Sequence, residues 1–221
     1  MLRVNAQSEP IVTAPPTRGR FITLEGIDGA GKSTHSSWLV DALASRGMNV
    51  VATREPGGTP LGEMLRDILL RQKMAHDSEA LLMFAARREH VVRVIEPALA
   101  RGDWVVCDRY TDATYAYQGG GHGVSLEFIG TLERLVHPAC NPDLTLLFDV
   151  PGSESRARLD RMRAKGRELD KFEQEAQAFF ERVRDAYLAR ARAEPTRFRV
   201  VDAVRPLPQV RADLQRIIDS L

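Results

Sequence analysis

Short apolar runs alternate with amphipathic stretches along the chain from residue 20 onward. The apolar runs predict five strands, over Phe21–Leu24, Val50–Thr53, Trp104–Cys107, Leu144–Asp149 and Arg197–Val201. The stretches between them predict helices over Lys32–Ser45, Leu61–Leu70, Ser78–Arg101, Leu126–Val136, Glu154–Ala164, Glu173–Ala193 and Pro208–Leu221. Because a run such as Leu144–Phe148 is almost wholly apolar, the strands suit a sheet covered on both faces. The pattern predicts a parallel α/β sheet flanked by helices, with ligands bound at the carboxyl ends of its strands.

The first residues of the chain lack this pattern. They hold Pro10, Pro15 and Pro16 among polar neighbours, and their longest apolar stretch is Ile11-Val12. We therefore expect residues 1–19 to be a disordered leader and not a secretory signal. Residues 20–221 are enough to form a single domain around one core.

Charge and cysteine content exclude several classes of protein. The formal net charge is +1, so no overall field favours nucleic acid or a membrane surface as a partner. No apolar run approaches the roughly 18 residues that a membrane-spanning helix needs. The two cysteines, Cys107 and Cys140, form no C-x-x-C motif and are typical of reduced thiols. The composition predicts a cytoplasmic protein.

A phosphate-binding loop follows the first predicted strand. Gly26 to Ser33 fits G-x-x-x-x-G-K-[ST] at every fixed position. Its glycines let backbone N–H groups turn inward around a phosphate, Lys32 places an ammonium against the phosphate oxygens, and Ser33 can ligate a bridging Mg²⁺. The loop predicts binding of a nucleoside triphosphate by Gly26, Ile27, Asp28, Gly29, Ala30, Gly31, Lys32, Ser33 and Thr34.

Charged residues also follow two other strands. The segment Thr53–Thr59 presents Arg54 from a rigid turn of proline and glycine. Asp108 ends an apolar strand, as a carboxylate that holds Mg²⁺ does, and Arg109 beside it suits a second anionic substrate. Asp149 is a rival for the metal position, and it also begins a D-x-x-G match to GTPases. No guanine-reading N-K-x-D follows, so we interpret that match as coincidental.

Two further residues have both a structural and a functional interpretation. Phe84, on a helix face, is by default a core residue, and stacking on a base is the alternative. Gln118, before three glycines, could hydrogen-bond a base edge or cap a turn.

Basic residues gather between residues 156 and 167, namely Arg156, Arg158, Arg161, Arg163, Lys165 and Arg167. Such a run can be a solvated face or a nucleic-acid patch, but aromatic residues for strand stacking are absent from it. Gly166 among so many cations favours a mobile lid, over about residues 154–170, that lays arginines across a triphosphate.

From about residue 20 to its C-terminus the chain resembles bacterial thymidylate kinase. The resemblance rests on five motifs in the family's order, E-G-x-D-G-A-G-K-S-T, T-R-E-P-G-G-T, D-R-Y, A-Y-Q-G-G-G and R-E-L-D-K-F-E. It implies a P-loop kinase fold with a five-stranded parallel sheet, phosphoryl transfer from Mg²⁺·ATP to dTMP, and a homodimer.

The resemblance also implies roles on the acceptor side. Asp28 would meet the 3′-hydroxyl of the dTMP sugar, and Arg54 and Arg109 would grip the acceptor phosphate. Arg87 would pair with the thymine edge, with Thr114 and Gln118 near the base. The family's stacking aromatic falls on Met83 or Phe84, and Phe84 is preferred.

On the donor side, Gly29 stands where some relatives carry an arginine in the loop, so the resemblance assigns the catalytic arginine to the lid. Arg163, Lys165 and Arg167 compete for that place, because Arg167 is an insertion relative to the commoner R-G-E-L-D. Lys32 and Arg109 are the other expected catalytic residues, and Ser33 and Asp108 the expected metal ligands.

Three alternatives stay open from the residues alone. Another P-loop nucleoside-monophosphate or small-molecule kinase would differ only on the acceptor side. A GTP-dependent switch is disfavoured by the missing N-K-x-D, and a nucleic-acid-binding ATPase by the small net charge.

Overall fold

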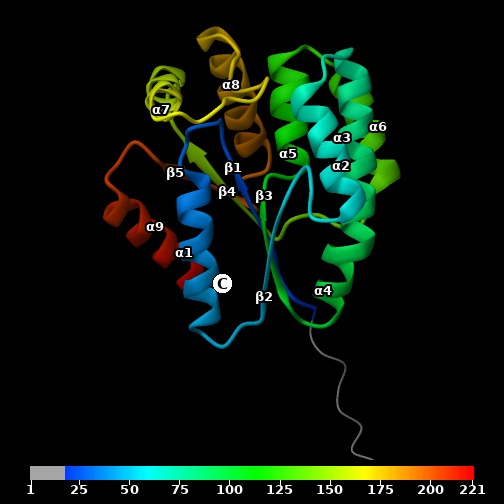
Figure 1. Ribbon diagram of the computed structural model, residues 1–221. Helices are drawn as coiled ribbons and strands as arrows, with labels where there is room; N and C mark the ends of the chain where they lie inside the picture. Colours follow the sequence, from blue (N-terminus) through cyan, green and yellow to red (C-terminus); the bar gives the residue numbers. More distant parts are fainter. Residues whose placement is uncertain (1–17) are drawn as a thin grey trace, which may run out of the picture.

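The computed structural model describes residues 18–221 and contains a five-stranded parallel sheet in the order β2-β3-β1-β4-β5 (Figure 1). The strands are β1 (Phe21–Glu25), β2 (Val50–Arg54), β3 (Trp104–Asp108), β4 (Leu144–Asp149) and β5 (Phe198–Asp202). The predicted fold class is confirmed, and each predicted strand lies within one residue of the observed bounds.

The helices cover both faces of this sheet (Figure 1). They are α1 (Lys32–Ala44), α2 (Pro60–Arg71), α3 (His76–His90), α4 (Glu96–Ala100), α5 (Thr111–Thr114), α6 (Leu126–Val136), α7 (Gly152–Ala164), α8 (Gln177–Ala193) and α9 (Leu207–Asp219). Two π-helical segments, η1 (Val91–Ile95) and η2 (Tyr115–Gly121), lie between α3 and α4 and after α5.

Three stretches differ from the sequence prediction. The helix predicted from Glu173 begins only at Gln177, as α8, after a turn. The single helix predicted over Ser78–Arg101 is α3, η1 and α4 in succession, because Pro97 has no amide to donate to the preceding turn. The stretch from Thr111 to Gly121 was not predicted to be helical, since its glycines favour a turn, yet it forms α5 and η2. Packing against α8 stabilises η2 there.

Alternation along the central strands divides the core between the two faces. Ile22 and Leu24 of β1 pack in the cluster that includes Leu39 of α1. Phe21 of β1 belongs instead to the cluster that holds Val91 and Leu99 on the other face. A sheet covered in this way leaves its strand ends as the place where polar side chains can gather.

The N-terminal end of the described chain is tied to the domain. Arg18 forms an ion pair with Asp143 at 2.9 Å, and the amide of Gly19 donates to the carbonyl of Leu99 at 2.9 Å. The rest of the predicted leader, residues 1–17, lies outside the described residues. Within the described part, no helix combines the length and apolarity needed to cross a membrane, and Cys107 and Cys140 are buried free thiols.

Candidate active site

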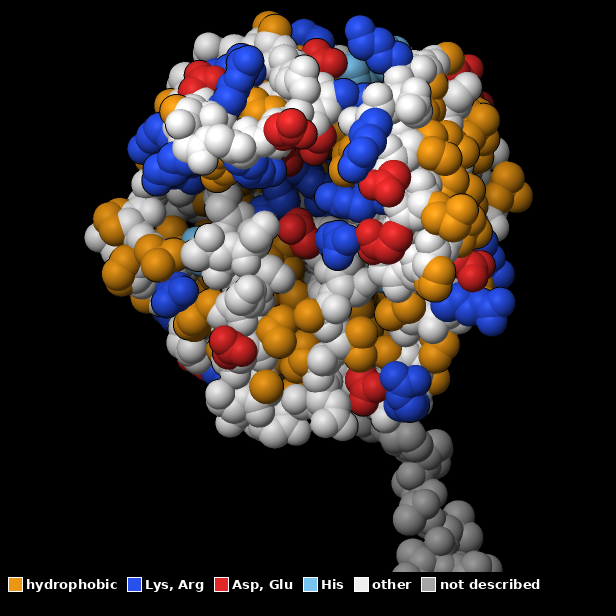
Figure 2. All heavy atoms as spheres, in the orientation of Figure 1, with side chains coloured by type: hydrophobic (Ala, Val, Ile, Leu, Met, Phe, Trp, Pro, Cys, Tyr) orange, Lys and Arg blue, Asp and Glu red, His pale blue; other side chains and the backbone are white. Residues whose placement is uncertain are grey.

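A cavity of about 370 Å³ opens at the carboxyl ends of β1, β2 and β3. Figure 2 shows the corresponding hollow, in which lysine, arginine and acidic side chains gather. Many of the predicted site residues line it, namely Asp28, Gly29, Gly31, Lys32, Ser33, Thr34, Arg54, Arg87, Asp108, Arg109, Thr114, Gln118 and Arg167. The fold therefore brings together residues from across the sequence that motifs had indicated separately.

The phosphate-binding loop folds around its lysine. Gly26 has φ of 137°, and a Cβ there would lie 2.4 Å from the carbonyl oxygen of Phe148, so only glycine fits. Lys32 Nζ donates to the carbonyls of Gly26 at 3.1 Å and Ile27 at 3.2 Å. Burial, and then the charge of Arg109, lower the pKa of Lys32. An ammonium held in this way inside the loop can turn toward a phosphate that the loop binds.

Both the backbone and the side chain of Arg109 are constrained in the cavity. It has φ of 69°, in the left-handed region that a non-glycine residue rarely adopts. Its Nη2 donates to Asp28 Oδ1 at 2.6 Å and to the Tyr117 hydroxyl at 3.0 Å, and its Nη1 donates to the Gly26 carbonyl at 3.0 Å. Burial raises the pKa of Asp28, but Arg109 and Lys32 outweigh it and leave that pKa below its ordinary value. A charged pair thus stands at the centre of the cavity.

Asp108 offers an acceptor that the protein does not use. Its Oδ1 is buried and finds no hydrogen-bond partner among the described residues, and the side chain lines the cavity with Ser33. A carboxylate oxygen and a hydroxyl are ligands that Mg²⁺ accepts, directly or through water. The two residues therefore fit a magnesium ion. The rival Asp149 is held by Arg184 at 2.6 and 2.9 Å and does not line the cavity.

Arg87 forms one wall of the cavity from the core side. It is 2% exposed, and its Nε donates to Glu55 Oε2 at 2.7 Å, while Nη2 donates to the Tyr110 carbonyl and the Thr114 hydroxyl at 3.2 Å each. Its Nη1 has no partner among the described residues. His90 holds the other oxygen of Glu55 at 2.9 Å. The result is a fixed guanidinium with one nitrogen, Nη1, whose N–H groups have no partner among the described residues.

Gln118 lines the same cavity as Arg87, and the carbonyl oxygen of its side-chain amide is free to accept a hydrogen bond. Its Nε2 donates to Glu79 Oε1 at 2.8 Å, and Lys171 Nζ donates to the other oxygen of Glu79. A carboxylate only accepts hydrogen bonds, so it fixes the amide with its nitrogen toward Glu79. No hydrogen bond to Gln118 Oε1 occurs in the described part of the chain, which leaves the carbonyl as an acceptor at the cavity.

Comparison with known proteins agrees with this geometry. The family model for thymidylate kinase matches residues 24–214. The chain belongs to the thymidylate kinase family. It is 63% identical to the thymidylate kinase of Bordetella petrii, covering 92% of this chain and 97% of that protein. It is 61% identical to the thymidylate kinase of Cupriavidus metallidurans, covering 92% of this chain and 100% of that protein. A crystal structure of thymidylate kinase from Ehrlichia chaffeensis superposes with a TM-score of 0.72 at 36% identity, covering 91% of this chain and 99% of that one.

The thymidylate kinase resemblance left the stacking position between Met83 and Phe84, with Phe84 preferred, and the structure places these two neighbours differently. Phe84 is 1% exposed and packs against His137, with ring centroids 6.1 Å apart, and against Arg87. Met83 lines the cavity and Phe84 does not. Successive side chains of a helix point about 100° apart, so Phe84 can face the core while its neighbour Met83 faces the cavity.

Of the three lid residues that competed within the thymidylate kinase pattern, only Arg167 lines the cavity. Its Nη2 donates to Glu173 Oε1 at 2.6 Å. Arg163 and Lys165, at the end of α7, are exposed and lie outside the cavity lining. Gly26, Ile27 and Ala30 also lie outside that lining, behind the loop surface.

Other residues of the site were not predicted. Arg158 of α7 donates to the carbonyls of Gly29 at 3.2 Å and Ala203 at 3.0 Å, which ties α7 to the phosphate-binding loop. Arg66 of α2 lines the cavity. The sequence signal for Arg158 was the basic run, but the run does not say which of its members faces inward.

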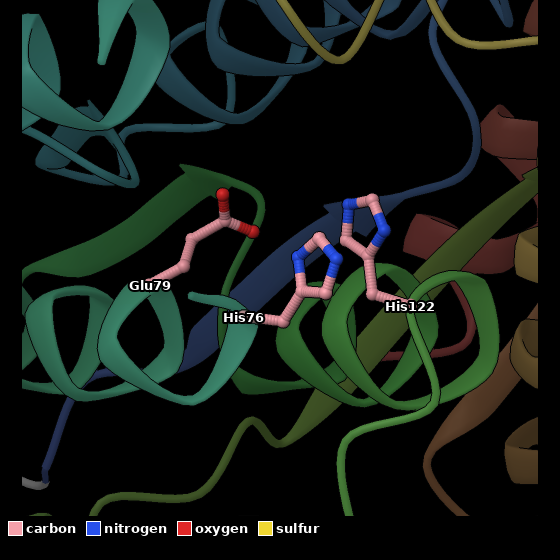
Figure 3. Close-up of side chains that lie close together, drawn as sticks. All are labelled: His76, Glu79 and His122. Carbon is pink, nitrogen blue, oxygen red and sulfur yellow. The ribbon is translucent and has the colours of Figure 1, made fainter. Parts of the chain in front are cut away.

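His76, Glu79 and His122 form a cluster beside the cavity, at the ends of α3 and η2 (Figure 3). The two imidazole rings are parallel to within 8°, with centroids 3.9 Å apart. Ligand lone pairs lie in the plane of each ring, so rings stacked face to face do not aim at one ion. Glu79 is already bonded to Gln118 and Lys171. We therefore interpret the cluster as a ring stack over a satisfied carboxylate.

Proposed function

We propose that this protein transfers the γ-phosphoryl group of ATP to dTMP, giving dTDP and ADP. Family membership supports this reaction, together with a cavity that joins a phosphate-binding loop to a polar pocket. Phosphoryl transfer asks mainly for positioning and charge neutralisation, and the cavity supplies cations on several sides.

The observation that carries the choice of base is the pair of unused groups in that pocket. Arg87 Nη1 offers a donor, and Gln118 Oε1 offers an acceptor. Thymine presents the complementary edge, with O4 as acceptor and N3–H as donor. Cytosine presents an amino group and an unprotonated N3. The Arg87 donor would then face another donor, and the Gln118 acceptor would face another acceptor. Met83 supplies an apolar surface for the ring.

We assign the other acceptor contacts to residues already fixed by the fold. Arg109 and the half-exposed Arg54, which is bonded to Glu63 at 2.8 Å, would hold the phosphate of dTMP. Asp28 would accept from the 3′-hydroxyl, and Thr114 would lie near the base. Because Asp28 also holds Arg109, sugar and phosphate recognition are coupled.

On the donor side, the backbone of Gly26–Thr34 would hold the ATP phosphates, with Lys32 against the β and γ oxygens. Ser33 and Asp108 would hold Mg²⁺, which when bound neutralises charge on the phosphates. Arg167 is the lid residue placed to meet charge on the transferring group, with Arg163 and Lys165 the rivals that the sequence left open. The lid, about residues 154–170, would exclude water, which could otherwise accept the phosphoryl group.

We also propose a homodimer formed through α2, α3 and α6. Exposed apolar side chains gather on these helices, namely Leu61, Met64, Ile68, Leu81, Leu126 and Leu135. Figure 2 shows apolar side chains along the edge where Figure 1 draws the three helices. An apolar face of this kind is typical of a protein interface. A cytoplasmic protein without a nucleic-acid or membrane partner is in keeping with the net charge of +1.

A coupled assay of ADP formation with a panel of nucleoside monophosphates tests the reaction. We expect turnover that requires ATP, Mg²⁺ and dTMP and is much weaker with UMP, CMP, AMP or GMP. CMP and AMP present an amino group where thymine has O4 and would leave buried polar groups without partners. UMP keeps the thymine edge but lacks the 5-methyl group and adds a 2′-hydroxyl, and GMP is a larger purine. Equal turnover with AMP or UMP would instead indicate another nucleoside-monophosphate kinase. A preference for GTP without any acceptor would indicate a GTP-dependent switch.

A further inference from the structure

Glu25 is a fully buried carboxylate at the end of β1, directly before the phosphate-binding loop. Its Oε1 accepts from the Tyr110 amide at 2.7 Å, and its Oε2 accepts from the Tyr187 hydroxyl at 2.7 Å. It forms no ion pair with any residue that the structure describes, and it does not line the cavity. The motif that contains Glu25 assigns it no role.

Both hydrogen bonds of Glu25 lead to Arg109. Tyr110 is the next residue along the chain, so its amide belongs to the peptide unit that leaves Arg109 at φ of 69°. The Tyr187 hydroxyl accepts from Arg109 Nη1 at 3.2 Å while it donates to Glu25. One carboxylate thus holds the strained backbone of Arg109 at one end and its guanidinium, through a tyrosine, at the other.

The charge of Glu25 does not help the protein to fold. Burial, with Asp112 nearby, raises the pKa of Glu25 to about 8, because the ionised form loses its hydration without a cation in direct contact. A strained backbone and a titratable group buried without an ion pair persist where the surrounding structure uses them for function.

We infer that Glu25 is a positioning residue, which holds Arg109 through the Tyr110 amide and the Tyr187 hydroxyl in the orientation that meets the acceptor phosphate. The inference rests on the proposed function, in which Arg109 binds the phosphate of dTMP. Tyr187 is the intermediate group, and it comes from α8, far along the chain.

Substitution of Glu25 tests this role by its effect on turnover. Glu25→Leu removes both acceptors, and we expect kcat with saturating dTMP and ATP to fall by roughly 10- to 100-fold, because small misplacements of a catalytic group have effects of this size. Glu25→Gln keeps one acceptor and should recover part of the loss. The KM for ATP should change by less than about threefold, since the loop backbone that binds ATP is untouched.

Tyr187→Phe tests the same contact without altering Glu25, and it keeps the test decisive if Glu25→Leu does not fold. We expect a loss of kcat in the same direction. The matched control is Tyr115→Phe, which removes another tyrosine–carboxylate bond, to Glu133 at 2.7 Å, outside the cavity lining. Its kcat should stay within about twofold of wild type.

The Glu25 substitution, repeated in a variant that lacks Arg109, distinguishes a positioning role from a general loss of structure. In Arg109→Lys the group that Glu25 orients is gone, so adding Glu25→Gln should lower the residual kcat by less than about threefold. A merely structural role would lower kcat by the same factor in both backgrounds.

Wild-type kcat in Glu25→Leu and Tyr187→Phe would overturn the inference and leave the proposed function standing. An equal loss with and without Arg109 would also overturn it. If the wild-type protein fails to phosphorylate dTMP, the proposed function fails first, and this inference with it.

Discussion

The three guanidinium nitrogens of Arg87 illustrate how one side chain can belong to both the core and the cavity. Nε and Nη2 are held by Glu55, the Tyr110 carbonyl and Thr114, and Nη1 has no partner among the described residues. A planar guanidinium has one orientation once two of its nitrogens are held. The direction of the remaining donor is therefore fixed before any ligand binds.

The side-chain carbonyl of Gln118, which we pair with the thymine base together with Arg87, leads to a prediction about base choice. Gln118→Ala removes the carbonyl that we pair with thymine N3–H, so kcat/KM for dTMP should fall about tenfold, the effect of one buried hydrogen bond. The value for dCMP should change far less, because that carbonyl opposes its N3. The half-buried Gln215→Ala on α9, outside the cavity lining, is the control. Parallel losses with both nucleotides would contradict the assignment.

His137 gives a prediction about stability and pH. Burial, with the charge of Arg87 nearby, lowers the pKa of His137 to about 4, from an ordinary value of 6.5. Between these values the unfolded chain takes up a proton that the folded protein excludes, so stability is lost as the pH falls. From pH 7.5 to 5 the free energy of unfolding should drop by about 2 kcal/mol more in wild type than in His137→Gln, as measured by denaturant titration. Equal drops would show that His137 does not titrate in this way.

At the scale of elements, α7 and the segment after it place the basic residues of the proposed lid in different surroundings. Arg158 ties α7 to the loop through the Gly29 carbonyl, and the chain then leaves the helix at Gly166 with φ of 88°. Only after that turn does Arg167 reach the cavity. The basic run therefore includes Arg158, which anchors α7, residues in solvent, and the half-exposed Arg167, which lines the cavity.

This division predicts unequal effects of single lid variants. Arg167→Ala should lower kcat by roughly 10³-fold, since an arginine that meets the transferring phosphoryl group has effects of at least this size. Arg163→Ala and Lys165→Ala should change kcat by less than about threefold, because exposed charges contribute little. Assays at saturating ATP and dTMP decide between them. A large loss in Arg163→Ala would instead place that residue in the closed lid.

At the scale of the whole molecule, α2, α3 and α6 pack side by side and leave apolar side chains outward. Met64 on α2 is 65% exposed and Leu135 on α6 is 74% exposed. We expect the protein to be a dimer by sedimentation, and Met64→Glu with Leu135→Glu to be a monomer, because charges there would be buried without partners. Val200→Glu, at an exposed apolar position on β5, should stay dimeric. A monomeric wild type would refute the proposed interface.

The sequence by itself determined the features that depend on neighbouring residues. The strand and helix periods, the glycine spacing of the phosphate-binding loop and the five motifs were enough for the fold class and the family. These signals are local, because a loop that encloses a phosphate or a strand buried on both faces constrains every residue within a short window. For that reason Lys32, Ser33, Arg54 and Asp108 could be indicated from local pattern, and they line the cavity.

The tertiary structure decided everything that depends on contacts between distant residues. Glu25 and Tyr187 are 162 positions apart, and Arg87 and Glu55 are 32 apart, so no spacing in the sequence indicates either bond. The choice between Met83 and Phe84 depends on the rotation of α3, and the choice of Arg167 on where the chain turns after α7. Rotation and direction are set by packing against other elements, which long-range contacts determine and local pattern does not.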